Sequence, residues 1–233
     1  MFTILLCVFL FFFSSGCTTP SSPPPHVSPV QAPLEAFISE PEPQEVALPS
    51  PREYHAVQEH LHTPCKSIGF PDTYDALIKK AHIKHMPPAL LHRACLLRAQ
   101  LAKESSLYAK ADSGHAIGLG QAIPAVADEC RESGLVGTRI NPRFSVNCAA
   151  WKNKRNWNFW TSERTEQCHV GLMLGSYVSG AGHFYRAQKK AATQGIFVSC
   201  VPDMAPFMTI HPENIATMQE YLSTIRRYEK EME

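Results

Sequence analysis

The sequence lacks several features that mark particular classes of protein. Lysine and arginine (22 residues) nearly balance aspartate and glutamate (21 residues), so no strongly basic surface is expected and nucleic acid is not a predicted partner. None of the eight cysteines forms a C-x-x-C pair, so we predict no zinc site, and no cofactor motif is present. There is no internal repeat. The chain has 233 residues and a hydrophobic fraction of 44%, which suits one globular domain with additional segments.

The first 16 residues have the composition of a signal peptide. An apolar run from Phe2 to Phe13 is too short for a comfortable bilayer span and has the length of a signal-peptide apolar region. It ends in Ser14-Ser15-Gly16-Cys17, which resembles the lipobox of bacterial lipoproteins. This resemblance implies that Cys17 is lipidated and anchors the chain in the bacterial cell envelope, as a periplasmic lipoprotein of the outer membrane. A plain secretory signal is the alternative, since no Lys or Arg precedes the run.

Residues 17–52 are rich in proline and serine, as in TTPSSPPPHVSPVQAP and EPEPQEVALPSP. Proline favours extended polyproline II backbone, so the segment is predicted to be a semi-rigid tether. The folded domain is therefore expected over residues 53–233.

Cysteine usage agrees with export. Apart from Cys7 in the signal and Cys17 at the anchor, six cysteines remain: Cys65, Cys95, Cys130, Cys148, Cys168 and Cys200. An even set in an exported chain predicts three disulfides, whose pairing the sequence leaves open. Some buried free thiols are the alternative.

Helical periodicity predicts a mainly α-helical domain with little or no β-sheet. A first helix is expected within residues 71–85, with Asp72 as its N-cap, because its apolar residues recur at helical spacing. Pro87-Pro88 ends that helix and begins another. In this second helix the apolar positions recur at i, i+4, i+7 and i+11: Leu90, Ala94, Leu97 and Leu101.

Glu104 follows at i+14, within about 40° of that apolar stripe. A carboxyl at the end of a buried stripe is desolvated, which disfavours its charged form and raises its pKa. An acid that stays protonated near neutral pH can serve as a general acid. Fraying of Glu104 into solvent in the last helical turn is the alternative.

Several further motifs surround Glu104 in an ordered set. Glu104-Ser105 is followed by Gly118-Leu119-Gly120-Gln121, then by Ile123-Pro124-Ala125, and later by SYVSGAG at residues 176–182. This set resembles the soluble lytic transglycosylase family, which has a goose-type lysozyme-like fold, over about residues 74–228. Two positions depart from the family pattern: Gly120 stands for a methionine and Val178 for an asparagine. Residues 130–170 also fit the pattern poorly.

The resemblance implies a peptidoglycan lytic transglycosylase that acts on glycan strands without a cofactor. Glu104 would be the catalytic acid and base, and the substrate-binding residues would be Ser105, Gln121, Tyr177, Gly180 and Tyr221. Gln121 has both a donor and acceptors for a sugar; Gln121→Ala is predicted to slow turnover while leaving the melting temperature nearly unchanged. Asp112, the nearest other acid in the loop, is interpreted as a loop-capping residue and not as a second catalyst.

Family chemistry uses one carboxyl where most glycosidases use two. The acid protonates the oxygen between N-acetylmuramic acid and N-acetylglucosamine, and then takes the proton of the muramic C6 hydroxyl as that oxygen attacks C1. The product ends in a 1,6-anhydro sugar. Two alternatives remain: a lysozyme of this fold that uses water, and a non-catalytic or weakly active peptidoglycan-binding lipoprotein of a secretion or pilus assembly, with envelope proteins as partners.

Other groups of residues have two interpretations each. The pairs His60-x-His62 and His82-x-x-His85 lack acidic or cysteine partners at ligand spacing, so we predict no metal. The aromatic residues between 151 and 160 suit either sugar stacking or core packing. Lys152, Lys154 and Arg155 suit either contact with anionic peptidoglycan or an ordinary solvated face.

Overall fold

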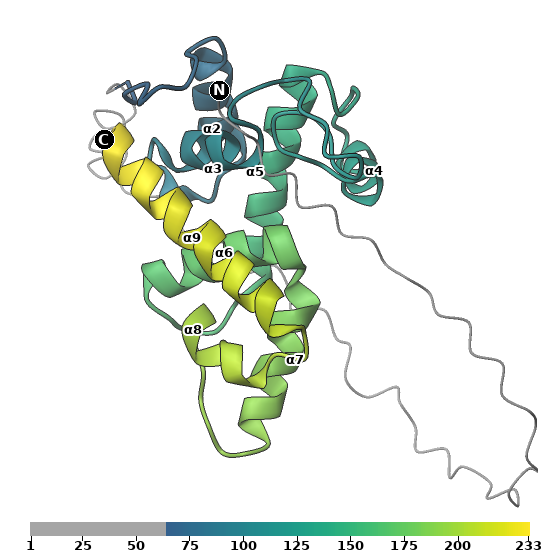
Figure 1. Cartoon of the computed structure of the whole chain (residues 1–233). Helices are drawn as coiled ribbons and strands as arrows, with labels where there is room; N and C mark the ends of the chain where they lie inside the picture. The colour runs from purple at the N-terminus through teal and green to yellow at the C-terminus, as the bar shows by residue number, and fades with distance from the viewer. Residues whose placement is uncertain (1–63) are drawn as a thin grey trace, which may run out of the picture. The chain divides into compact units, whose positions relative to one another are not determined.

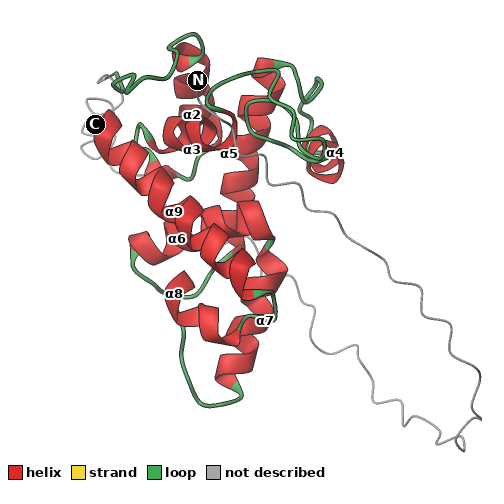
Figure 2. Ribbon diagram, in the orientation of Figure 1, coloured by secondary structure: helices red, strands yellow, loops and turns green. Residues whose placement is uncertain are grey.

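The computed structural model describes residues 64–233, and this part of the chain is mainly α-helical, as predicted (Figure 2). Residues 64–233 contain eight α-helices and two short 3-10 helices. They contain no strand, only the isolated bridges of Ile117 with Asp112 and with Ala122. The predicted signal peptide, Cys17 and the tether lie outside the described residues.

The first two helices form where helical periodicity places them, but their beginnings differ from the prediction. Helix α2 spans Asp75–His85 and its N-cap is Tyr74, so Asp72 is not the cap. The Asp72 carboxylate instead accepts hydrogen bonds from Ser67 Oγ and from the guanidinium of Arg98. The prediction of the cap was wrong because a buried cation recruits this carboxylate more strongly than the helix end does.

The predicted second helix is divided in two. Residues Pro88–Leu90 form the 3-10 helix η1, and α3 begins only at Leu96 and spans Leu96–Ser105. Leu90 therefore lies outside α3, although its side chain is fully buried. Leu97, Leu101 and Glu104 remain on one face of α3, so the inward direction predicted for the Glu104 side chain does not depend on Leu90.

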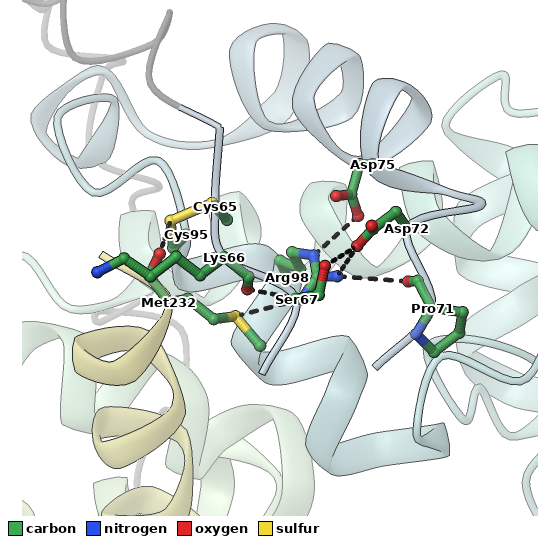
Figure 3. Close-up of polar contacts among 9 residues, drawn as sticks. All are labelled: Cys65, Lys66, Ser67, Pro71, Asp72, Asp75, Cys95, Arg98 and Met232. Atoms are coloured by element: carbon green, nitrogen blue, oxygen red, sulfur yellow. Dashed lines mark hydrogen bonds and ion pairs between the residues drawn. A yellow bond between two sulfur atoms is a disulfide. The ribbon is translucent and has the colours of Figure 1, made fainter. Parts of the chain in front are cut away.

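Arg98 of α3 is buried, and its side chain is 2% exposed. Figure 3 shows its guanidinium meeting acceptors from the segment before α2 and from α2 itself. Nε donates to Asp75 at 2.8 Å, and one terminal nitrogen donates to Asp72 at 3.1 Å and to the Pro71 carbonyl at 3.3 Å. The other terminal nitrogen lies 3.5 Å from the Lys66 carbonyl. A buried cation costs free energy unless it is paired. This set of partners therefore stabilises the packing of α3 against α2 and the segment before it.

Six more α-helices and one 3-10 helix complete the described chain: α4 (Pro124–Glu132), α5 (Pro142–Phe159), α6 (Glu166–Ser179), α7 (Ala181–Ala192), α8 (Val201–Met204), η2 (Ala205–Phe207) and α9 (Pro212–Met232). Helix α9, yellow in Figure 1, runs across α3 and α6 and contacts both. In its last turn, the Met232 carbonyl accepts a hydrogen bond of 2.8 Å from the backbone N–H of Lys66. The long C-terminal helix thus closes the domain over α3.

The buried side chains form one main core and one smaller cluster. The main core lies between α2, α3, α5, α6, α7 and α9. The smaller cluster joins α4 to the beginning of α5 through Ala127, Cys130, Phe144 and Cys148. Helix α4 is therefore attached to the domain by little buried surface of its own.

Three disulfides are present in the described part, which confirms the predicted number. They pair Cys65 with Cys95, Cys130 with Cys148, and Cys168 with Cys200. Bonds of this kind typically contribute about 2–4 kcal/mol each. In residues 64–233 we find no helix with the length and apolar character that crossing a membrane requires.

Candidate functional site

Glu104 lies in the last turn of α3, where the helix stops abruptly. Ser106 has φ +53° and is the C-cap, and its N–H bonds the Ala102 carbonyl. Leu107 follows with φ +57°. Left-handed backbone is strained for residues other than glycine and is often retained at functional sites. This double left-handed turn takes the chain away from the helix directly behind Glu104 and leaves its carboxyl at a helix end.

Tyr221 of α9 is the hydrogen-bond partner of the Glu104 carboxyl. Its hydroxyl donates to Glu104 Oε1 at 2.5 Å. Burial raises the pKa of Glu104 to about 7, even though the Tyr221 hydrogen bond and the charge of Lys103 act in the opposite direction. Burial also raises the pKa of Tyr221 well above its usual value, and the nearby Glu104 charge adds to this effect. The site therefore holds an acid that is partly protonated at neutral pH beside a neutral tyrosine.

The loop after α3 is drawn against α5 by glycines. A Cβ on Gly118, whose φ is +87°, would lie 2.0 Å from the Arg139 carbonyl oxygen. A Cβ on Gly120 would lie 3.0 Å from both Ala149 Cβ and the Tyr177 hydroxyl. The Tyr177 hydroxyl donates to the Gly120 carbonyl at 2.5 Å. A methionine at position 120, as in the pattern that the sequence resembles, would not fit this packing without a shift, which accounts for the glycine.

Gln121 has a structural part in this loop as well as a place in the site. Its Nε2 donates to the Ala111 carbonyl at 3.1 Å and to the Gly118 carbonyl at 2.9 Å, and its φ is +44°. Both amide protons are therefore used by the protein, and Oε1 is the atom left for a ligand. This changes the expectation from sequence, because loss of the side chain removes two loop hydrogen bonds and should lower stability.

A cavity of about 320 Å³ opens in front of Glu104. Its walls come from α3, the loop after it, α4, α5 and α6: Glu104, Ser113, Ala116, Gln121, Ala122, Ile123, Val126, Lys152, Tyr177 and Val178. Among these described residues Glu104 is the only acid. The volume is in the range of small-molecule sites, and a perturbed acid in a cavity is the usual signature of such a site.

The structure brings together most of the residues predicted for the site, but not all of them. Gln121 and Tyr177 line the cavity with Glu104, and Tyr221 lies behind the carboxyl. Ser105 turns inward, where its hydroxyl bonds the Leu101 carbonyl at 3.1 Å, and it does not line the cavity. Gly180, with φ +80°, separates α6 from α7 and is also absent from the lining.

Asp112 and Val178 have the surroundings that their side-chain chemistry suggests. Asp112 is exposed, and its Oδ1 accepts the Gly114 N–H at 2.7 Å, so it caps the loop as predicted. Val178 lies on the cavity wall and is 46% exposed. It presents a methyl surface where the family pattern has an amide.

The sequence left the role of Lys152 open between contact with peptidoglycan and a solvated face, and it did not place α5 in the site. Lys152 lines the cavity, and its ammonium lies 2.6 Å from Glu129 of α4, which Arg155 also contacts at 2.7 Å. One carboxylate thus faces two cations, which leaves a positive charge on this wall. The resemblance is weak over residues 130–170 and gave no indication of this wall.

The aromatic residues after position 150 mostly pack against protein. Trp160 is 3% exposed and donates to Ser176 Oγ at 3.0 Å, and Trp157 stacks on His169 with ring centroids 3.5 Å apart. Phe159 is 51% exposed and meets Tyr185 edge-on. Core packing is therefore the correct interpretation for Trp157 and Trp160.

A second cavity, of about 370 Å³, lies around the Cys168–Cys200 disulfide between α6, α8 and α9. Its described lining contains one ionisable side chain, that of Arg226, and no carboxyl, so the smaller cavity at Glu104 is the better candidate for acid–base chemistry. Within residues 64–233 no group of three His, Cys, Asp or Glu side chains gathers at metal-ligand distance. The His82 ring is buried and bonds the Leu90 carbonyl at 3.2 Å.

No protein-family model matches the chain, and no curated protein matches it either.

Proposed function

We propose that this chain is a peptidoglycan lytic transglycosylase with a lysozyme-like fold and that Glu104 is its acid and base. The observation that carries the proposal is the Glu104 carboxyl, whose pKa is raised to about 7 by burial, at the edge of a cavity of about 320 Å³. A general acid works best when its pKa is near the working pH. The ordered motifs around residues 104, 121 and 177 support the same choice of reaction.

The proposed reaction needs one carboxyl and no water. Protonated Glu104 gives its proton to the oxygen that joins N-acetylmuramic acid to N-acetylglucosamine, and the bond from C1 to that oxygen breaks. The muramic C6 oxygen then bonds C1 and passes its proton to the Glu104 carboxylate, which restores the acid. Glu104 is the only acid among the described cavity-lining residues, which favours this scheme over one with a second carboxylate.

Digestion of purified sacculi followed by mass spectrometry tests the reaction. The wild-type chain is expected to release fragments with 1,6-anhydro ends, each one water lighter than the reducing ends that a lysozyme gives. Glu104→Gln keeps the shape of the side chain but cannot transfer a proton, so activity should fall by at least about 10²-fold. Asp112→Asn is the matched control, since it also exchanges a carboxylate for an amide and should have little effect.

Retention of more than about a tenth of wild-type activity by Glu104→Gln would refute the assignment of the acid. Reducing ends in place of anhydro ends would identify a lysozyme.

A peptidoglycan-binding lipoprotein without catalysis is the second candidate, and Val178 is the observation that favours it. This residue provides no hydrogen bond at the cavity wall, where the family pattern has an asparagine. Binding of sacculi without release of any fragment, by wild type and by Glu104→Gln alike, would establish this alternative.

The proposed location is the periplasmic side of the bacterial outer membrane, through a lipid on Cys17. Cys17→Ser is expected to move the protein from the membrane fraction to the soluble periplasmic fraction. Fractionation of wild type with the soluble proteins would exclude the anchor.

A further inference from the structure

The wall that α5 contributes to the Glu104 cavity carries two cations and one carboxylate. Glu129 of α4 accepts a hydrogen bond from Lys152 Nζ at 2.6 Å and another from the Arg155 guanidinium at 2.7 Å. Both cations bond the same carboxylate oxygen, Oε2. Two positive charges therefore share one negative charge, and the three side chains together have a net charge of +1.

The two cations differ in where they lie. Lys152 lines the cavity, and its side chain is 16% exposed. Arg155 does not line the cavity, its side chain is 54% exposed, and its guanidinium lies 5.7 Å from the centroid of the Trp151 ring. Lys152 is thus the only cation among the described residues that line the cavity, and Arg155 reaches Glu129 from outside it.

Arg155 makes the bond between Lys152 and Glu129 replaceable. When Lys152 turns away, Glu129 keeps a cationic partner in Arg155, so its carboxylate is not left unpaired. The lysine side chain has a flexible stem, and its ammonium has three donors. Exchange of Glu129 for a second carboxylate in the cavity therefore leaves every charge of the group paired.

The cavity has little negative charge to oppose an incoming anion. Glu104 is the only acid among the described lining residues, and burial raises its pKa to about 7. A partly enclosed ammonium attracts an anion more strongly than an ammonium in open water, because less solvent screens the pair. The protonated form of Glu104, which is the form that donates, is thus also the form that leaves Lys152 most attractive to an anion.

We infer that Lys152 binds the carboxylate of N-acetylmuramic acid itself, and that the chain therefore prefers glycan strands from which the stem peptide has been removed. The inference rests on the proposed function, in which Glu104 acts on the linkage at C1 of muramic acid. The lactyl carboxyl is attached to C3 of the same ring, so it enters the cavity with the linkage that is cut. In a peptide-free strand this group is a carboxylate, whereas in a peptide-bearing strand it is the uncharged carbonyl of an amide.

The stem peptide has carboxylates of its own, and they are the other anions on a glycan strand. They lie at least one amino acid further from the sugar ring than the lactyl group does. The described lining of the cavity includes five apolar side chains: Ala116, Ala122, Ile123, Val126 and Val178. A peptide backbone packed against these side chains would lose hydrogen bonds to water without replacing them. The lactyl carboxylate is therefore the better partner for Lys152.

A bridge that only holds α4 to α5 is the competing explanation of Lys152. Both explanations predict a loss of stability in Lys152→Met, so stability does not separate them. A purely internal bridge does not respond to the charge of a sugar substituent. Affinity for matched glycans that differ in this charge is therefore the readout.

The test is calorimetric binding of three glycans to the full chain carrying Glu104→Gln, which prevents turnover. The first glycan is a peptide-free tetrasaccharide of alternating N-acetylglucosamine and N-acetylmuramic acid. The second is the same tetrasaccharide with stem peptides, and the third is a tetramer of N-acetylglucosamine, which has no lactyl group. We expect the first to bind about tenfold more tightly than the other two, because only its lactyl groups are charged acceptors.

Variants of the charged wall assign this preference to one side chain. Lys152→Met should weaken binding of the peptide-free tetrasaccharide about tenfold and leave the other two affinities unchanged. Arg155→Met is the matched control, because it removes the other cation on Glu129 Oε2 but no cavity residue, and all three affinities should stay within about twofold. Glu129→Gln should tighten binding of the peptide-free tetrasaccharide, because it removes the carboxylate that competes for Lys152.

Equal affinity for the three glycans, or no binding of any of them, would overturn the inference. Equal losses in Lys152→Met and Arg155→Met would also overturn it, as would tighter binding of the peptide-bearing tetrasaccharide, which would assign Lys152 to a stem-peptide carboxylate.

The same measurements distinguish failure of this inference from failure of the proposed function. Preferential binding of the peptide-free tetrasaccharide by a chain that releases no fragments from sacculi would refute the transglycosylase and support the role of Lys152. Release of anhydro fragments by a chain with no preference among the glycans would support the proposed function and refute the role of Lys152.

Discussion

Arg98 and Glu104 lie six residues apart on α3, and the protein places their charges in opposite surroundings. The Arg98 guanidinium contacts two carboxylates and two backbone carbonyls, so its buried positive charge is compensated (Figure 3). Glu104 has one neutral donor, Tyr221, and a cavity. The pKa of Glu104 is raised as a result. One helix thus has a structural end at Arg98, where the charge is fully bonded, and a reactive end at Glu104, where the carboxyl has a single hydrogen-bond partner.

The largest expected effect on stability is at the structural end. Arg98→Met should lower the free energy of unfolding by about 3 kcal/mol, because it removes the shared partner of Asp72, Asp75 and two carbonyls. Asp72→Asn changes only an exposed partner and should cost about 0.5 kcal/mol. Urea unfolding of the two variants measures both values.

If Arg98→Met also shifts the titration of Glu104, the two ends of α3 are coupled and the comparison fails.

The Glu104→Gln substitution has the next largest expected effect on stability, and this effect depends on pH in a defined direction. Since the pKa of Glu104 is raised from 4.5 to about 7, the protonated carboxyl stabilises the fold below pH 4.5, and this contribution is lost as the pH rises through 7. The variant has no such group. Relative to wild type it should therefore gain about 1–3 kcal/mol between pH 4.5 and pH 8.

Unfolding of wild type and Glu104→Gln across this pH range gives the difference directly. A constant difference would mean that the carboxyl does not resist ionisation in the folded protein.

Gln121, which has both a structural role and a place in the cavity, is expected to show a smaller effect than Arg98 or Glu104. Gln121→Met keeps the length of the side chain but loses the hydrogen bonds to Ala111 and Gly118, so we expect a loss of about 1–2 kcal/mol. Turnover should fall too, because Gln121 lines the cavity. Thermal unfolding and cleavage of sacculi, measured on the same sample, separate the two effects.

An unchanged melting temperature would restore the purely substrate-binding interpretation of Gln121 that the sequence favours.

The parts predictable from sequence are those that short-range spacing controls. The interval from Leu97 to Leu101 to Glu104 is helical whatever the tertiary structure, so the inward direction of the carboxyl follows from it. The even number of cysteines after the predicted signal and anchor likewise predicts three disulfide bonds. The N-cap at Asp72 was predicted wrongly, since Arg98 lies 26 residues away in sequence and its need for a partner is not a local property.

The hydrogen bond between the buried amides of Gln100 and Asn153 has no comparable signal in the sequence. Gln100 and Asn153 are separated by 53 residues, and either amide on its own suits a helix surface. Only the packing of α3 against α5 makes them partners. Ser105 shows the converse, because its position beside Glu104 in the motif suggests a ligand contact, whereas helix geometry directs its hydroxyl to Leu101.

Helix α4 supplies one wall of the cavity through Val126, but its buried cluster is separate from the main core. Regions of a protein with few buried contacts open locally while the rest stays folded. The Cys130–Cys148 bond therefore makes α4 part of the same cooperative unit as α5. In a chain whose thiols are reduced, α4 would be the first helix to detach, and the cavity would lose a wall before the domain lost its fold. On the proposed function, the binding site would then be incomplete wherever the thiols stay reduced and complete only where they are oxidised.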